Sequence, residues 1–147
     1  MTRRTAALLA LHGLVMIFLG CVAGASYGAA IVNNLGTEAE RAWKLAHMEG
    51  VQNGILLLAL AGGSVWMTLG RAGENTVLWA AVLAGYGNTL GAMIGAATGY
   101  RGLAPEGPAA NWVVFGAFMF GMWGVLVAVP VAAVGAWKRL REPDAPQ

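Results

Sequence analysis

The chain has 147 residues, of which 58% are hydrophobic, 11% are charged and 22 are glycine. A soluble globular protein carries about 25% charged residues, so a surface of ordinary polarity is excluded. Disorder is excluded as well, because the apolar content is high and the net charge is only +2. A single cysteine excludes a disulfide framework and a cysteine-based zinc site. The composition predicts an integral membrane protein with one domain, residues 1–147.

Four apolar segments are long enough to form helices that cross a hydrocarbon layer about 30 Å thick. They cover about residues 5–32, 43–69, 76–100 and 112–137. The link between the second and third segments is short, which predicts that these two helices are antiparallel neighbours. The predicted fold class is therefore all-α, an integral-membrane four-helix bundle.

The basic residues indicate an orientation in the membrane. Six of them fall on the side that holds both termini: Arg3, Arg4, Arg71, Lys138, Arg139 and Arg141. Arg41, Lys44 and Arg101 fall on the other side. Because cytoplasmic loops carry an excess of Lys and Arg, we expect both termini in the cytoplasm and the protein in the inner membrane. The basic residues form no nucleic-acid site, and the glycines lie inside apolar segments, unlike those of a dinucleotide-binding loop.

Glycines recur in steps of four within three of the segments. The series are Gly20, Gly24 and Gly28, then Gly50 and Gly54, and then Gly87, Gly91, Gly95 and Gly99. Small residues at this spacing allow the backbones of membrane helices to approach closely. A four-helix chain offers few internal neighbours for so many glycine faces, so we expect a homo-oligomer.

Polar side chains inside a membrane span are costly unless paired, so they are candidate functional residues. Most gather at the start of the second segment, namely Lys44, His47, Glu49, Gln52 and Asn53. The third segment adds Tyr86, Asn88 and Thr89, and the first contains His12.

His47 is the strongest candidate for a metal ligand. At about 100° per residue, Gly54 lies roughly 20° from His47 around the helix, and Gly50 flanks the same direction. We expect an imidazole on an otherwise bare face, where a flat macrocycle has room to lie against Gly50 and Gly54. Neutral imidazole ligates iron, and a single axial histidine often holds haem. A histidine at the membrane interface, hydrogen-bonded to water or a lipid headgroup, is the simpler interpretation.

Three other interpretations of these residues stay open. A bis-histidine haem electron carrier would use His12 as the second ligand. A small four-helix transporter would use Glu49 as a proton-coupled carboxylate. In a packing protein, Tyr86 and Asn88 would connect helices by hydrogen bonds.

The segment His47–Gly54, HMEGVQNG, resembles the His-x-Glu-Gly-x-x-Asn-Gly segment of hydroxylaminobenzene mutases. His12-Gly13 and Tyr86-Gly87 are similar to features of the same group. The chain also resembles styrene oxide isomerases, small four-span enzymes in which the same histidine is followed six residues later by asparagine. Gly87-Asn88 and Arg101-Gly102-Leu103 carry this second resemblance.

The resemblance implies a trimer that holds haem b between its subunits. It implies that His47 binds the ferric iron and that Asn53 donates a hydrogen bond to the substrate oxygen. Glu49, Tyr86 and Asn88 would then handle protons or orient the substrate. Enzymes of the first group convert hydroxylaminobenzene into an aminophenol, and those of the second convert an aryl epoxide into an aldehyde, both without net redox change.

The chain departs from the styrene oxide isomerases at two positions. Ala84 and Ala92 stand where those enzymes have an aspartate and a tyrosine that assist epoxide opening. The substrate we expect is therefore a small aromatic hydroxylamine, hydroxylaminobenzene, with an aryl epoxide as the alternative.

Overall fold

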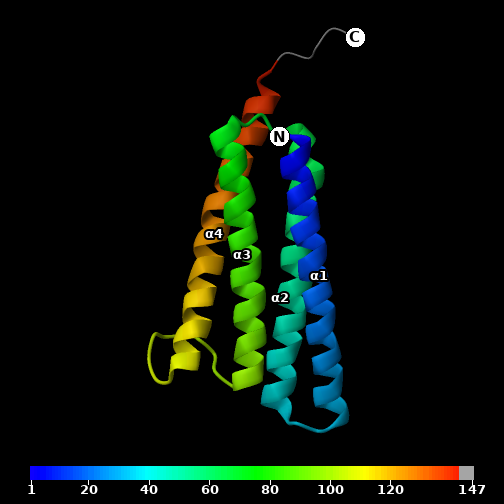
Figure 1. Cartoon of the computed structure of the whole chain (residues 1–147), viewed down its shortest axis with the longest axis vertical. Coiled ribbons are helices and arrows are strands. Elements are labelled where there is room, and N and C mark those ends of the chain that lie inside the picture. Colours follow the sequence, from blue (N-terminus) through cyan, green and yellow to red (C-terminus); the bar gives the residue numbers. More distant parts are fainter. Residues whose placement is uncertain (143–147) are drawn as a thin grey trace.

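The computed structural model describes residues 1–142, which form four long helices joined by short links (Figure 1). The helices are α1 (Arg3–Val32), α2 (Thr37–Gly62), α3 (Arg71–Thr98) and α4 (Ala109–Leu140), and a short 3₁₀ helix, η1 (Gly63–Trp66), follows α2. The described residues contain no strand. The predicted all-α bundle is confirmed, while the last five residues of the predicted domain lie outside the described part.

The second helix differs from its predicted bounds at both ends. It begins at Thr37 instead of residue 43, because Glu38 and Glu40 occupy its first turn, where carboxylates stabilise the positive end of the helix dipole. It ends at Gly62 instead of residue 69, because the chain tightens into η1 and then becomes extended at Met67. The polar link predicted before this span is thus largely helical.

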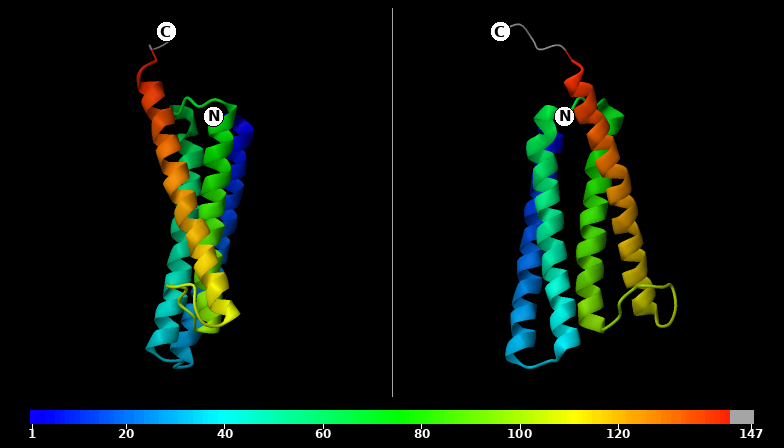
Figure 2. Two further views of the ribbon diagram at one scale, coloured as in Figure 1. Left: turned by 90° about the vertical axis from the view of Figure 1, so that its left-hand side faces the viewer. Right: turned by 180° about the vertical axis from the view of Figure 1, so that it is seen from behind.

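Three of the four helices, α1, α3 and α4, are long and apolar enough to cross a membrane. The fourth, α2, runs alongside α1 through the length of the bundle but is the least apolar, since its first half carries the charged and amide residues (Figure 2). Of the four predicted spans, three are strongly apolar helices in the structure, and the fourth, α2, is more polar than the others. This polar helix carries His47 and Asn53.

The bundle consists of two helical hairpins, α1 with α2 and α3 with α4, which meet chiefly through α2 and α3 (Figures 1 and 2). Fully buried side chains at the junction include Leu9, Met16, Leu57 and Val77. The outer faces expose large apolar side chains such as Phe18 and Trp123. Such a surface suits lipid or a further copy of the chain.

The N-terminus, the α2–α3 link and the end of α4 lie together at one end of the bundle (Figure 1). The α1–α2 and α3–α4 links lie at the other end. The structure therefore gathers Arg3, Arg71 and Lys138 at one end and places Arg41 and Arg101 at the opposite end, as predicted. Which end faces the cytoplasm stays a prediction.

The regular glycines mark contacts within the chain. A Cβ added to Gly50 would lie 2.5 Å from Gly20 Cα, and one added to Gly87 would lie 2.7 Å from the backbone nitrogen of Gly121. Most of these glycine faces therefore do have internal neighbours, because α1 covers Gly50 and Gly54 of α2 and α4 covers Gly87 and Gly91 of α3, while the homo-oligomer stays a prediction. Gly28 differs, since a Cβ there would meet nothing within 4 Å.

Candidate active site

His47 lies on the side of α2 that faces α1. Its Nδ1 is 2.8 Å from the backbone carbonyl oxygen of Gly20. Because a carbonyl oxygen only accepts hydrogen bonds, Nδ1 carries the hydrogen, and in the neutral ring Nε2 keeps a free lone pair. Histidines that ligate metals usually donate their other N–H to a carbonyl or carboxylate in this way. The geometry prepares Nε2 of His47 as a ligand atom.

Glycines on α1 make room for this imidazole. A Cβ added to Gly24 would lie 2.8 Å from His47 Nδ1, so any larger residue there would displace the ring. The ring is nevertheless only half-buried. Part of the residue is therefore accessible from outside the chain.

The bare helix face predicted around His47 is not found. Gly50 packs against Gly20, and a Cβ on Gly54 would lie 2.7 Å from the carbonyl oxygen of Gly13. The prediction that Gly50 and Gly54 border a cofactor is therefore wrong. These two glycines contact α1, which fills the space that the sequence suggested for a macrocycle.

Asn53 and Glu49 form a pair one turn apart on α2. The amide nitrogen of Asn53 donates to the backbone oxygen of Glu49 at 2.8 Å and to its carboxylate Oε2 at 2.9 Å. Asn53 is 7% exposed. Both amide hydrogens are thus engaged, so the predicted donation to a substrate oxygen requires that one of these bonds break. In this arrangement Asn53 instead offers its carbonyl Oδ1, an acceptor.

His47 and Asn53 lie on different sides of α2. Six residues separate them, which corresponds to a rotation of about 120° and a rise of about 9 Å along the helix. Because His47 faces α1, the two side chains do not converge on one point within a single chain.

Tyr86 contacts His12 rather than the Glu49–Asn53 pair. The Tyr86 hydroxyl is 3.1 Å from His12 Nδ1, and the two rings meet edge to face. This contact joins α1 to α3. His12 precedes Gly24, the residue that contacts His47, by twelve positions, or roughly 18 Å along the helix. His12 and His47 of one chain are therefore too far apart to hold the same haem iron.

Asn88 lies in the contact between α3 and α4, where its side chain fills the space left by Gly121. It is thus not brought to Glu49 or Asn53. The next residue, Thr89, is fully buried, and its hydroxyl is the one buried side-chain polar atom without a partner in the part of the chain that the structure describes. Of the three predicted assisting residues, only Glu49 lies beside Asn53.

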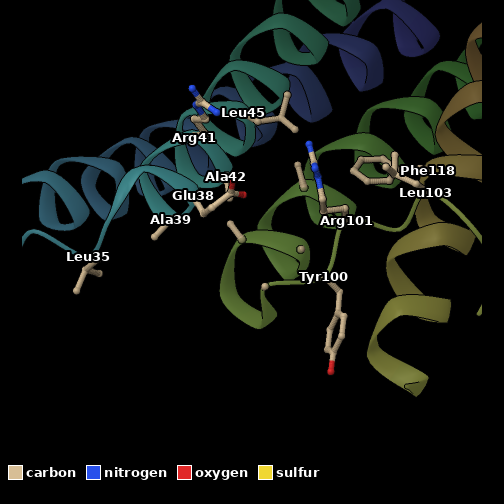
Figure 3. A pocket seen from close by; sticks show the side chains of 14 residues that line it. Leu35, Glu38, Ala39, Arg41, Ala42, Leu45, Tyr100, Arg101, Leu103 and Phe118 are labelled. Carbon is tan, nitrogen blue, oxygen red and sulfur yellow. The ribbon is translucent and has the colours of Figure 1, made fainter. Parts of the chain in front are cut away.

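A cleft of about 660 Å³ opens between the first turns of α2 and the end of α3 (Figure 3). Ala42 and Leu45 line it from α2, and Glu49 follows Leu45 by four residues, so all three lie on one side of the helix. Arg41 and Arg101 come from opposite walls. In the sequence, both arginines indicate orientation and Arg101 also carries the family resemblance, while their shared place at one end of the predicted bundle is the signal that could link them.

The two alanines that depart from the epoxide isomerases lie in different surroundings. Ala84 is fully buried, and a Cβ on Gly124 of α4 would come within 2.9 Å of its Cα. A carboxylate at position 84 would thus need α4 to move. Ala92 lines the cleft, where its small side chain leaves space that a tyrosine would fill.

No three side chains of His, Cys, Asp or Glu gather into a metal site within residues 1–142. A metal held through one protein ligand, as in haem with an axial histidine, needs no such cluster. The free Nε2 of His47 therefore fits haem better than a metal ion held only by protein side chains.

Residues 5–137 match the family described as styrene oxide isomerase. No curated protein and no solved structure matches the chain. Because the family match spans nearly the whole chain, the chain belongs to the styrene oxide isomerase family. It is accordingly an isomerase and a membrane protein.

Proposed function

We propose that this member of the styrene oxide isomerase family is a haem b-dependent enzyme that rearranges a small aromatic substrate without net redox change. The observation that carries the proposal is the hydrogen bond from His47 Nδ1 to Gly20, which leaves Nε2 free to ligate iron. Ferric haem, when bound, supplies a Lewis acid for a lone pair of the substrate oxygen. We place the enzyme in the inner membrane with both termini in the cytoplasm, following the distribution of basic residues.

The site needs two copies of the chain. His47 and the Glu49–Asn53 pair lie on different sides of α2, so one copy cannot direct both at the same ligand. A homotrimer, as the resemblance to styrene oxide isomerases implies, would bring His47 of one copy to Glu49 and Asn53 of the next.

Hydroxylaminobenzene is the substrate that the polar pair favours. The free atom of Asn53 is an acceptor, and hydroxylaminobenzene carries N–H and O–H donors, whereas an aryl epoxide carries none. In the rearrangement the N–O bond breaks, a C–O bond forms on the ring, a ring hydrogen leaves as a proton, and a proton is taken up, so the formula is unchanged. The Glu49 carboxylate accepts a hydrogen bond from the Asn53 amide and so orients Asn53 with its Oδ1 free for the substrate.

An aryl epoxide is the second candidate substrate, and the family match favours it. Its C–O bond would open at the benzylic carbon and a hydride shift would give the aldehyde. Either reaction benefits from apolar walls, because water would trap a cation on the substrate. Assays of one preparation with hydroxylaminobenzene and with styrene oxide distinguish the two substrates.

The test of the haem assignment is the variant His47→Ala, with His12→Ala as the matched control. We expect His47→Ala to lose both the haem Soret band and isomerisation. His12→Ala should keep the Soret band, because Tyr86 rather than a metal is its partner. A His47→Ala protein that retains the Soret band contradicts the assignment, and a colourless wild-type protein would favour a transporter or a packing protein.

A further inference from the structure

The cleft between α2 and α3 combines apolar walls with two cationic side chains. Its apolar lining includes Leu35, Leu45 and Phe118, and its charged residues are Glu38, Arg41 and Arg101. Neither arginine forms an ion pair in the part of the chain that the structure describes. One carboxylate beside two unpaired guanidinium groups leaves the cleft with a net positive charge.

We infer that this cleft receives the edge of the haem that bears the propionates, and that Arg41 and Arg101 bind their two carboxylates. The inference rests on the proposed haem-dependent function. Haem is a flat apolar ligand with two carboxylates along one edge, which complements apolar walls with two guanidinium groups on opposite sides (Figure 3). Guanidinium groups bind carboxylates through two parallel hydrogen bonds, so each arginine suits one propionate.

The position of the arginines along the bundle agrees with this assignment. Both lie at the end that holds the α1–α2 and α3–α4 links, and both side chains are exposed. A propionate at this depth keeps its charge near water, while the porphyrin ring lies deeper between apolar side chains. A carboxylate held in the middle of the bundle would lose this hydration at a high cost.

The cleft accepts the haem of a second copy rather than that of its own chain. His47 lies two residues after Leu45, which is about 200° around α2 from the cleft, and only about 3 Å further along the helix. In a ring of identical copies around one axis, equivalent residues lie at equal depth. A haem on His47 of one copy would therefore approach the cleft of its neighbour at the level of Leu45.

The test compares haem with its dimethyl ester, which has the same ring and iron but no carboxylates. The full-length protein, freed of haem, is titrated with each compound, and the Soret band gives the two dissociation constants. We expect the wild type to bind haem roughly 10- to 100-fold more tightly than the ester, because charge-assisted hydrogen bonds are among the stronger ones. In the double variant Arg41→Gln/Arg101→Gln this preference should fall to near one.

The matched control is Arg4→Gln/Arg71→Gln, which removes two arginines at the other end of the bundle and should keep the preference. The affinity for the ester reports whether the variant site is intact, and the two single arginine variants serve if the double variant does not fold. A preference that survives in Arg41→Gln/Arg101→Gln overturns the inference. Oleate is tested as a second ligand. If the variant Arg41→Gln/Arg101→Gln loses affinity for oleate but not for haem, the inference is also overturned, and the cleft would be assigned to a fatty acid.

The outcomes separate this inference from the proposed function. A wild-type protein that binds neither compound refutes the haem-dependent function and the inference with it. A wild-type protein that binds both compounds equally refutes only the role of the two arginines.

Discussion

A backbone carbonyl fixes the chemistry of His47. The Gly20 carbonyl oxygen accepts a hydrogen bond from Nδ1–H, so Nε2 keeps the free lone pair that a metal ligand needs, without help from another side chain. The sequence singles out the imidazole, because a histidine inside an apolar segment is costly and rare. It does not reveal that the partner is a carbonyl exposed by a glycine on the preceding helix.

Glu49 acts on Asn53 as a positioning residue, and its replacement should change substrate preference. Glu49→Leu frees one amide hydrogen of Asn53, which can then donate to an epoxide oxygen. We expect the ratio of kcat/KM for styrene oxide to that for hydroxylaminobenzene to rise about fivefold, the value of one ordinary hydrogen bond. Glu49→Gln keeps an acceptor for Asn53 and should leave the ratio unchanged. A parallel change in both variants would indicate that the charge of Glu49 matters instead.

Thr89 offers a test of stability. Its buried hydroxyl has no partner within the described residues, and Thr89→Val replaces it by a methyl group of similar size. We expect the free energy of unfolding to rise by about 1 kcal/mol, measured by thermal denaturation in detergent, because a buried polar group without a partner is destabilising. The control is Thr76→Val, whose hydroxyl is exposed and donates to Ala72 at 2.9 Å. A loss of stability in Thr89→Val alone would contradict the absence of a hydrogen-bond partner for this hydroxyl.

At the level of helices, α1 and α2 form one functional unit. The contact between Gly20 and Gly50 brings the two backbones together, and this approach places the Gly20 carbonyl against His47. The polar half of α2 is tolerated because α1 covers one side of it and α3 packs on another. The glycine series thus serves the site indirectly, through helix packing.

Adding one methyl group to α1 should therefore have opposite effects at two glycines of the same series. Gly20→Ala places a Cβ 2.8 Å from the backbone nitrogen of Val51, so we expect a loss of about 1–3 kcal/mol in stability and a weaker Soret band. Gly28→Ala meets nothing within 4 Å and should be neutral or stabilising by up to about 1 kcal/mol, since alanine favours helix. Thermal denaturation and haem absorbance measure both effects. Equal behaviour of the two variants would argue against the contact.

For the whole molecule, the main consequence is that one chain is half of the proposed site. The outer faces of the bundle carry large apolar side chains, including Phe18 and Trp123, which lipid or another copy must cover. His47 is half-buried and faces α1, whereas Glu49 and Asn53 lie on another side of α2. A site that uses all three needs more than one chain.

Co-expression of His47→Ala and Asn53→Ala chains tests the shared site. Each variant alone should be inactive. In randomly mixed trimers about one interface in four combines an intact His47 with an intact Asn53, so we expect about a quarter of wild-type activity. Activity in the mixture that stays at the level of the separate variants would place both residues on one chain's own ligand, and size determination of the wild type checks the trimer.

Local patterns along the chain are enough to identify the class of the molecule and its main elements. Apolar runs, scarce charges and glycines in steps of four predict a helical membrane bundle, because helix and lipid impose periodicities and lengths that a sequence shows directly. The expense of polar groups in lipid likewise identifies His47, Glu49 and Asn53. Such local signals depend only on residues near one another in the chain.

The contacts that each of these residues makes follow from how the helices pack in three dimensions. Gly50 and Gly54, predicted on a bare face, contact α1, and Tyr86 contacts His12. His47 and Asn53 lie on different sides of α2. A sequence specifies the angle of a residue around its own helix but not which neighbour lies at that angle. The neighbour is set by the packing of whole helices, and that packing depends on residues far apart in the chain.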